Sequence, residues 1–209
     1  MSLWIRLGKV TLSNPPALEK LVQEFSKLPS IGRKTARRLA FHLISGDREK
    51  MEHLATALME AKTKLIRCTR CYGFSEEDIC QICASPGRDR EVLCVVERAS
   101  DILPFENSGI HKGLYFVLGG VLSPLDGIKP ETLHIPELME RIEHEGIKEL
   151  ILALGSSPEA ESTALYIDRI LANSAIRRTR LARGIPVGSD LEFIDDVTML
   201  RAFEERVKL

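Results

Sequence analysis

Four cysteines occur in two Cys-x-x-Cys pairs, Cys68 with Cys71 and Cys80 with Cys83, and eight residues separate the pairs. Each pair can turn both thiolates onto one metal ion, and two such knuckles complete a tetrahedral S₄ shell. We therefore predict a Zn²⁺ site that is structural, because no coordination position stays open. The alternatives are two disulfides or a redox Cys-x-x-Cys, but a redox motif needs one pair at a helix N-terminus. The fifth cysteine, Cys94, lies in an apolar run and is expected to be a buried packing residue.

The net charge of -1 conceals an uneven distribution along the chain. Residues 1–90 carry 16 Lys and Arg against 10 Asp and Glu, whereas residues 91–209 carry 13 against 20. This division favours one module that faces a polyanion and another that faces a basic partner or metal ions. Two solvated surfaces of opposite sign are the alternative explanation.

The composition is that of a globular protein of one to two domains, with 44% hydrophobic residues among 209. No apolar stretch approaches the roughly 20 residues of a membrane span, and the first residues lack the long apolar region of a signal peptide. Together with cysteines spaced for a metal rather than for disulfides, this predicts a cytoplasmic protein without a membrane segment.

Hydrophobic periodicity predicts three helices ahead of the cysteines. Apolar residues at helical spacing mark a first helix over residues 16–27, which Pro29 ends. A second helix is expected from Arg33 to the break at residues 46–47, and a third over residues 51–65. The outward face of the second helix is basic and carries Arg33, Lys34, Arg37 and Arg38.

The turn between the first two helices, Leu-Pro-Ser-Ile-Gly-Arg-Lys-Thr at residues 28–35, resembles the hairpin of the helix-hairpin-helix motif of nucleic-acid-binding proteins. A turn of this kind lets backbone N–H groups approach a phosphate while basic side chains neutralise it. Binding should then be largely independent of sequence and steeply dependent on salt. Lys34 and Arg38 share a helix face and are the first candidates for phosphate contact, with Arg33 and Arg37 second.

Ser30 departs from this motif, which has a glycine at that position, and we expect the substitution to alter the turn. A solvated helix face in a small bundle is the alternative explanation for the basic residues. The zinc module that follows directly along the chain favours nucleic-acid binding.

From residue 91 the pattern changes to apolar strands that alternate with helices. Strands are expected over residues 91–96, 113–118, 147–154 and 176–182, and helices over residues 135–145 and 159–171. This alternation predicts an α/β fold with a mostly parallel sheet covered by helices on both faces. Functional residues of such sheets gather at the carboxyl ends of the strands. Four acids fall there: Glu97 and Asp101 after the first strand, and Glu159 and Glu161 after the third.

This layout resembles the Toprim domain of primases, topoisomerases of types IA and II, and certain repair proteins. In its catalytic members a glutamate ends the first strand and an Asp-x-Asp pair follows the third, so that Mg²⁺ can be held at a phosphodiester. Glu97 matches the first acid, but Gly155 and Ser157 stand where the aspartates would be. Because oxygen ligands for a two-metal site are largely missing, we expect no catalysis.

Two enzymatic functions are the alternatives to a non-catalytic protein. A Mg²⁺-dependent Toprim nuclease would have to use Glu97, Glu159 and Glu161, with Asp126 as a further ligand. An ATP-driven motor would need a phosphate-binding loop, and no Gly-x-x-x-x-Gly-Lys-[Ser/Thr] occurs to serve the acidic pair at residues 195–196.

A helical hairpin, a Cys₄ zinc module, a Toprim-like domain and a tail that begins Gly-Ile-Pro-Val-Gly at residue 184 follow one another. This order resembles the RecR family of recombination mediators from about residue 15 onward. The departures are Ser30 and Ala160, since the family has glycine at both positions. The resemblance divides the chain into an N-terminal arm at 1–14, a helix-hairpin-helix domain at 15–66, a Cys₄ zinc finger at 67–84, a Toprim domain at 91–186 and a C-terminal oligomerisation tail at 187–209.

The resemblance implies a DNA-repair protein that is not an enzyme. Such a protein acts with RecO and RecF to help RecA load at single-stranded gaps coated by single-strand-binding protein. It implies ring-shaped homo-oligomers, from dimer to tetramer, on single-stranded, gapped or duplex DNA, with Lys34 and Arg38 facing the DNA. The acids Glu97, Asp101, Glu159 and Glu161 would engage RecO. Zinc binding contributes on the order of 10 kcal/mol to the folding of such modules, so we expect Cys71→Ala to destabilise the N-terminal half.

Overall fold

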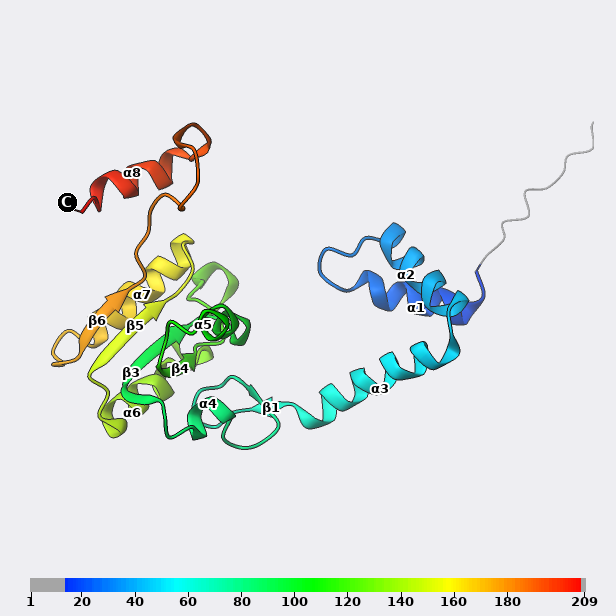
Figure 1. Ribbon diagram of the computed structural model, residues 1–209, viewed down its shortest axis with the longest axis horizontal. Helices are drawn as coiled ribbons and strands as arrows, with labels where there is room; N and C mark the ends of the chain where they lie inside the picture. The colour runs from blue at the N-terminus through cyan, green and yellow to red at the C-terminus, as the bar shows by residue number, and fades with distance from the viewer. Residues whose placement is uncertain (1–13, 208–209) are drawn as a thin grey trace, which may run out of the picture. The chain divides into compact units, whose positions relative to one another are not determined.

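The computed structural model describes residues 14–207, which form two compact units that meet in sequence between Thr63 and Lys64 (Figure 1). The arm expected over residues 1–14 lies outside the described residues, except for Asn14. Each unit has its own elements and is described by itself.

The first unit is helical and its core lies between two helices. Helix α1 spans Pro16–Ser26, α2 spans Arg33–Ser45 and α3 spans Arg48–Lys64, close to the three predicted helices. In α2 the buried residues are alanines, whose short side chains let α1 approach closely. None of the described residues of α3 is buried, so this helix contributes no side chain to the core of the unit. The core consists of Leu18 and Val22 from α1 and Ala36 and Ala40 from α2.

The second unit contains a four-stranded parallel sheet in the order β4-β3-β5-β6. Its strands are β3 at Asp89–Val96, β4 at Gly113–Val117, β5 at Glu149–Ala153 and β6 at Arg177–Arg180. All three strand pairs are parallel, as the α/β pattern predicts. In the central strand Val96 lies beside Val117 on one side and Ala153 on the other, so three strands end together at one edge.

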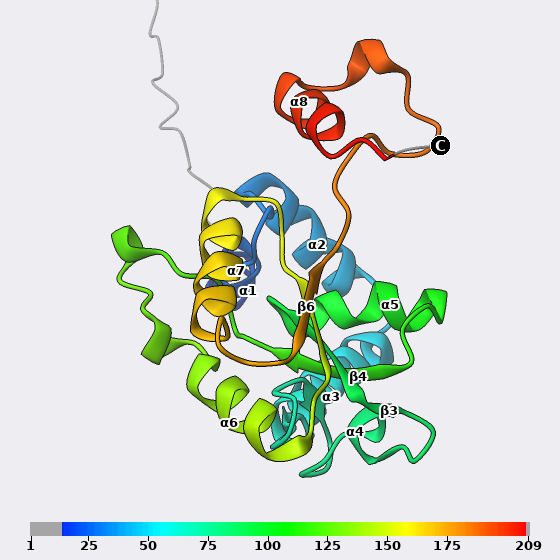
Figure 2. The same ribbon diagram turned by 90° about the vertical axis from the view of Figure 1, so that its left-hand side faces the viewer.

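Helices cover both faces of this sheet, which confirms the predicted fold class (Figure 2). Helices α6 at Ile135–Glu145 and α7 at Pro158–Ile170 pack on one face, where Phe116, Leu138 and Ile167 are fully buried. Helix α5 at Ile102–Ser108 covers the other face. Short 3₁₀ turns connect these elements at Ala99–Asp101, Pro124–Asp126 and Pro130–Thr132.

Small elements precede and follow the strands of the sheet along the sequence of this unit. The cysteines lie on a two-stranded antiparallel ribbon, β1 at Ile66–Arg67 and β2 at Phe74–Ser75, and on helix α4 at Gln81–Ala84. After β6 come a 3₁₀ turn at Leu191–Phe193 and helix α8 at Asp196–Glu204. Neither contains a buried residue. In the described part of the chain, no helix combines the length and the apolarity needed to cross a membrane.

Candidate metal centre and nucleic-acid interface

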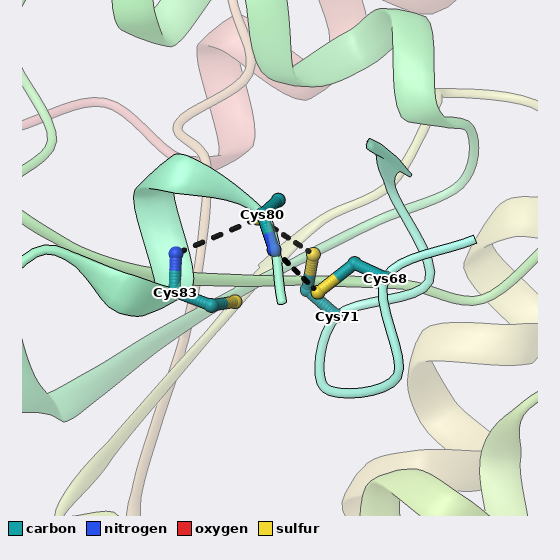
Figure 3. Close-up of side chains that lie close together, drawn as sticks. All are labelled: Cys68, Cys71, Cys80 and Cys83. Carbon is teal, nitrogen blue, oxygen red and sulfur yellow. Dashed lines mark hydrogen bonds between the residues drawn. The ribbon is translucent and has the colours of Figure 1, made fainter. Parts of the chain in front are cut away.

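The four paired cysteines converge on one point, with all four Sγ atoms within 4.8 Å of one another (Figure 3). The Sγ atoms of Cys71 and Cys80 are 3.6 Å apart. Zn–S bonds of about 2.3 Å in a tetrahedron place sulfur atoms roughly 3.8 Å apart, whereas a disulfide needs about 2.05 Å. All four cysteines are free, so the geometry fits a Cys₄ zinc site and excludes the disulfide alternative.

Backbone N–H groups surround these sulfurs as they do in metal-binding knuckles. The N–H of Cys80 donates to Sγ of Cys68 over 3.3 Å, and that of Gly73 donates to Sγ of Cys71 over 3.4 Å. Burial raises the pKa of the Cys68 thiol, but N–H groups from Cys80, Cys71 and Arg70 outweigh burial and lower the pKa to about 7. These donors stabilise the thiolate of Cys68, one of the four that a zinc ion requires.

Cys94 belongs to a different environment, the interior of the sheet, where only 1% of its surface is exposed. Burial raises the pKa of its thiol to about 12, so it remains protonated. This confirms that Cys94 is a packing residue.

The hairpin between α1 and α2 keeps a tight turn despite its departure from the motif. Ser30 has a φ of 64°, the left-handed conformation that glycine adopts most readily. The sequence predicted that serine would alter this turn, but the serine adopts the glycine conformation itself.

The start of α2 has free backbone donors. Gly32 is the N-cap, no side chain within residues 14–207 accepts a hydrogen bond from the first turn, and the first turn contains no acid. A Cβ placed on Gly32 would meet nothing within 4 Å, so the approach to these N–H groups is open. Unpaired N–H groups at a helix start attract anions, phosphate above all.

Basic side chains border this helix start, and all four predicted DNA-binding residues are exposed. Arg33 forms an ion pair with Glu19 of α1. Lys34, Arg37 and Arg38 form no ion pair or side-chain hydrogen bond within residues 14–207, which leaves their charges available. The helix start and these three side chains together form an exposed, positively charged surface.

Two of the four predicted acids meet at the carboxyl edge of the sheet. Glu97 and Asp101 line a cavity of about 320 Å³ together with Gly155. Glu97 is paired with Arg98 at 3.0 Å between Oε1 and Nη2, and Asp101 accepts a hydrogen bond from the backbone N–H of Arg98 at 2.8 Å. Arg98 thus provides a partner for both carboxylates, its side chain for Glu97 and its backbone N–H for Asp101.

The other two acids lie on the first turn of α7 and do not join them. Glu159 is exposed, and its carboxylate makes no bond to the described residues. Glu161 is paired with Arg180 and Arg183, and the Arg183 hydrogen bond is the main reason that its pKa is lowered. Within residues 14–207, no three acids approach one another closely enough to share a metal ion, and the four cysteines form the one such cluster.

Sequence reasoning missed the arginines that engage these acids. Arg180 and Arg183 also bind Glu205 and the carbonyl of Gly155, respectively. The only signal was a run of polar residues, 177–180, at the edge of an otherwise apolar sheet. A run of this kind marks an edge strand but does not identify the partner of each side chain.

The structure therefore combines a helix-hairpin-helix unit, a zinc finger with four cysteine ligands and a Toprim domain in one chain. Models of the same modules match the sequence: RecR helix-hairpin-helix over residues 18–62, the RecR zinc finger domain with four cysteines over 65–85, Toprim domain over 91–182 and RecR C-terminal over 184–207. This set of modules defines a recombination protein of the Toprim class.

Proteins from several bacteria are similar to this one over most of its length. The "Recombination protein RecR" of Chlorobaculum tepidum is 50% identical over 195 residues, which cover 91% of this chain and 96% of that protein. Those of Rubrobacter xylanophilus and Moorella thermoacetica are 48% and 47% identical over 92% and 93% of this chain, and over 97% and 98% of their own lengths. The chain belongs to the RecR family.

Proposed function

We propose that this protein is a non-catalytic DNA-binding mediator of recombinational repair, which acts with RecO and RecF to help RecA load at gaps coated by single-strand-binding protein. The observation that carries the proposal is the uncapped start of α2 beside the unpaired Lys34 and Arg38. The relatives' shared name supports the role in recombination. RecO, RecF and RecA come from the family resemblance.

The DNA contacts proposed here are to phosphate. Backbone N–H groups and basic side chains bind phosphates without reading base edges, so single-stranded, gapped and duplex DNA all fit. Arg38 follows Lys34 by one helical turn, which puts both charges on the same side of α2. Arg37 extends this surface, and Arg33 contributes when its pair with Glu19 is exchanged for a phosphate.

The acidic carboxyl edge of the sheet is the proposed contact for RecO. The exposed carboxylate of Glu159, and the carboxylates of Glu97 and Asp101 at the ends of the strands, offer negative charge to a basic partner. Glu161 differs from the other three because two guanidinium groups neutralise it. We therefore expect Glu161 to position the segment that carries Arg183.

The proposed lack of catalysis rests on the same carboxylates. A Mg²⁺ site at a phosphodiester needs several oxygen ligands around one point. The described acids do not form such a group. A small Toprim nuclease is the alternative, and the experiment below separates the two.

Exposed apolar side chains support the proposed oligomer, from dimer to tetramer. In the tail, Leu191, Phe193 and Phe203 are 62%, 77% and 68% exposed. Large exposed apolar patches on a globular protein mark contacts with other chains. Reduced cysteines arranged for a metal support a cytoplasmic location.

The decisive experiment incubates end-labelled gapped DNA with the protein and Mg²⁺, and runs the same samples on native and denaturing gels over a salt series. Retarded but uncut DNA, with an affinity that falls steeply as salt rises, is the expected result. Cleavage products that disappear when EDTA is added would replace the mediator with the nuclease. DNA that stays unretarded at low salt would remove the DNA-binding assignment.

A further inference from the structure

The zinc knuckle at residues 68–73 is bonded to the outer edge of the Toprim sheet. Among the strands that the structure describes, β4 pairs only with β3, so the backbone groups on its other side need partners from outside the sheet. The N–H of Val117, the last residue of β4, donates to the carbonyl of Cys71 over 2.8 Å. A zinc ligand is therefore bonded directly to the sheet through its own backbone.

A buried arginine makes the second connection. Arg141 lies on α6, and only 5% of its side chain is exposed. Its Nη1 donates to two backbone carbonyls, that of Arg70 in the knuckle and that of Tyr115 in β4, each over 2.9 Å. One guanidinium nitrogen thus joins the loop between two zinc ligands to the edge strand.

The charge of Arg141 is balanced at the same place. Glu145, one turn further along α6, accepts from Nε of Arg141 over 2.9 Å and pairs with Nη2 of Arg70 over 2.8 Å. Glu145 therefore links both arginines, and the knuckle is held through the backbone and the side chain of Arg70. A buried charge is retained without great cost only where such partners are present.

Aromatic contacts fix the remaining part of the knuckle. Tyr72 adopts a φ of 61°, which a bulky side chain rarely does. Its ring stacks on His134 with centroids 3.8 Å apart and meets Phe116 edge-on at 5.4 Å. These contacts place the residue after Cys71 against the N-cap residue of α6 and a buried side chain of β4.

We propose that Arg141 is a positioning residue of the zinc site: it holds the knuckle in its metal-binding conformation from within the Toprim domain, so that zinc and sheet stabilise each other. Arg141 does not touch the metal position and acts through the carbonyl of Arg70. Groups that orient ligands in this way commonly change metal affinity tenfold to a hundredfold when they are removed.

The chain contains a matched control for this role. Arg88 is also largely buried, pairs with Glu106, and donates to the carbonyls of His111 and Gly113 near the opposite end of β4. It makes none of its bonds to the knuckle. Arg88→Met and Arg141→Met therefore remove comparable support from the sheet, but only the second should reach the zinc site.

The test measures zinc affinity of the full chain by competition with a chromogenic chelator, together with the rate of zinc release. Arg141→Met is expected to weaken zinc binding by about tenfold to a hundredfold, and Arg88→Met by less than about threefold. Hydrogen exchange of the Val117 amide in the parent protein should accelerate when zinc is withdrawn, because its acceptor is then no longer held. Equal zinc affinity in the parent and Arg141→Met, with only a lowered melting temperature, would overturn the proposal.

A second variant keeps the test decisive if Arg141→Met does not fold. Glu145→Gln leaves both guanidinium groups in place but replaces the carboxylate that they bind with a neutral amide, which weakens both contacts. We expect zinc affinity to fall by a factor between about three and ten. Unchanged affinity in a folded Glu145→Gln protein would equally contradict the proposal.

Discussion

Arg183 donates a hydrogen bond from Nη2 to the backbone carbonyl of Gly155 over 3.2 Å. Gly155 stands where catalytic Toprim domains are expected to have their first aspartate of the pair. The same guanidinium also binds the carboxylate of Glu161. Arg183 thus joins the segment after β6 to the loop after β5 and to the first turn of α7.

This arrangement predicts a dependence of stability on pH. Because Arg183 lowers the pKa of Glu161, the ion pair contributes fully above the ordinary carboxyl pKa of 4.5 and is lost as the pH falls through the lower pKa of the folded protein. Arg183→Gln is expected to cost about 1 kcal/mol or less at pH 7, since the pair is partly exposed. Thermal unfolding of both proteins from pH 7 to pH 3 should show the difference shrinking below pH 4.5. Arg169→Gln, which removes a charge from the exposed end of α7, is the control and should show no such convergence.

The hairpin assignment predicts that Lys34→Glu with Arg38→Glu abolishes DNA binding. Two side chains that neutralise phosphates are replaced by two that repel them, so no retarded DNA is expected even at low salt. The fold should persist because both side chains are exposed and form no ion pair in the described structure. Gel shifts measure the loss of DNA binding, and size-exclusion chromatography checks that the fold persists. Lys20→Glu with Lys50→Glu makes the same change of charge elsewhere on the unit and should bind nearly as well as the parent; DNA affinity unchanged in the hairpin variant would remove the assignment.

The open start of α2 predicts a separate effect of backbone access. A Cβ at Gly32 would meet nothing within 4 Å, so Gly32→Val should cost only the roughly 1 kcal/mol of a poor N-cap residue. The side chain blocks the approach of a phosphate to the N–H groups, and affinity for DNA should fall by roughly tenfold, the equivalent of about one charge-assisted hydrogen bond. Gly87→Val, at another uncrowded glycine, is the control. Equal loss of affinity in both variants would point to a general defect instead.

The zinc site predicts different outcomes for two buried cysteines. Cys71→Ser should lower zinc content and destabilise the protein by several kcal/mol, because metal binding supplies folding free energy. Cys94→Ala should retain one zinc per chain and cost about 1 to 2 kcal/mol through lost packing. Elemental analysis and chemical denaturation measure both quantities. Full zinc content in Cys71→Ser would show that this thiolate is no ligand.

The structure assigns the effect of zinc on stability to the second unit rather than to the N-terminal half. The sequence order suggested that zinc supports the N-terminal half, but the cysteines belong to the unit that begins at Lys64 and bond to the edge of its sheet. We therefore expect the melting of the sheet to move with zinc, while the hairpin of α1 and α2 keeps its own stability. Circular dichroism with and without chelator, compared with hydrogen exchange in α1, shows whether zinc stabilises the sheet or the hairpin.

The amino-acid sequence by itself determined the elements and the ligands of this protein. The spacing of two Cys-x-x-Cys pairs specifies an S₄ site, and the change from a helical period to apolar runs near residue 91 specifies an α/β domain. These signals are local, since each depends on residues within a few positions of one another. The bounds of α6 agree with the prediction at both ends for that reason.

Only the tertiary structure decided which side chains meet. Arg141 and the carbonyl of Arg70 are separated by 71 positions, and Arg183 and Gly155 by 28, yet each pair is in hydrogen-bonding contact. No periodicity encodes such a contact, because it depends on strand order and on how α6 and the C-terminal segment pack against the sheet. The predicted acids show the same limit: their positions along the chain place all four near strand ends, but the fold brings Glu97 to Asp101 and turns Glu161 toward two arginines.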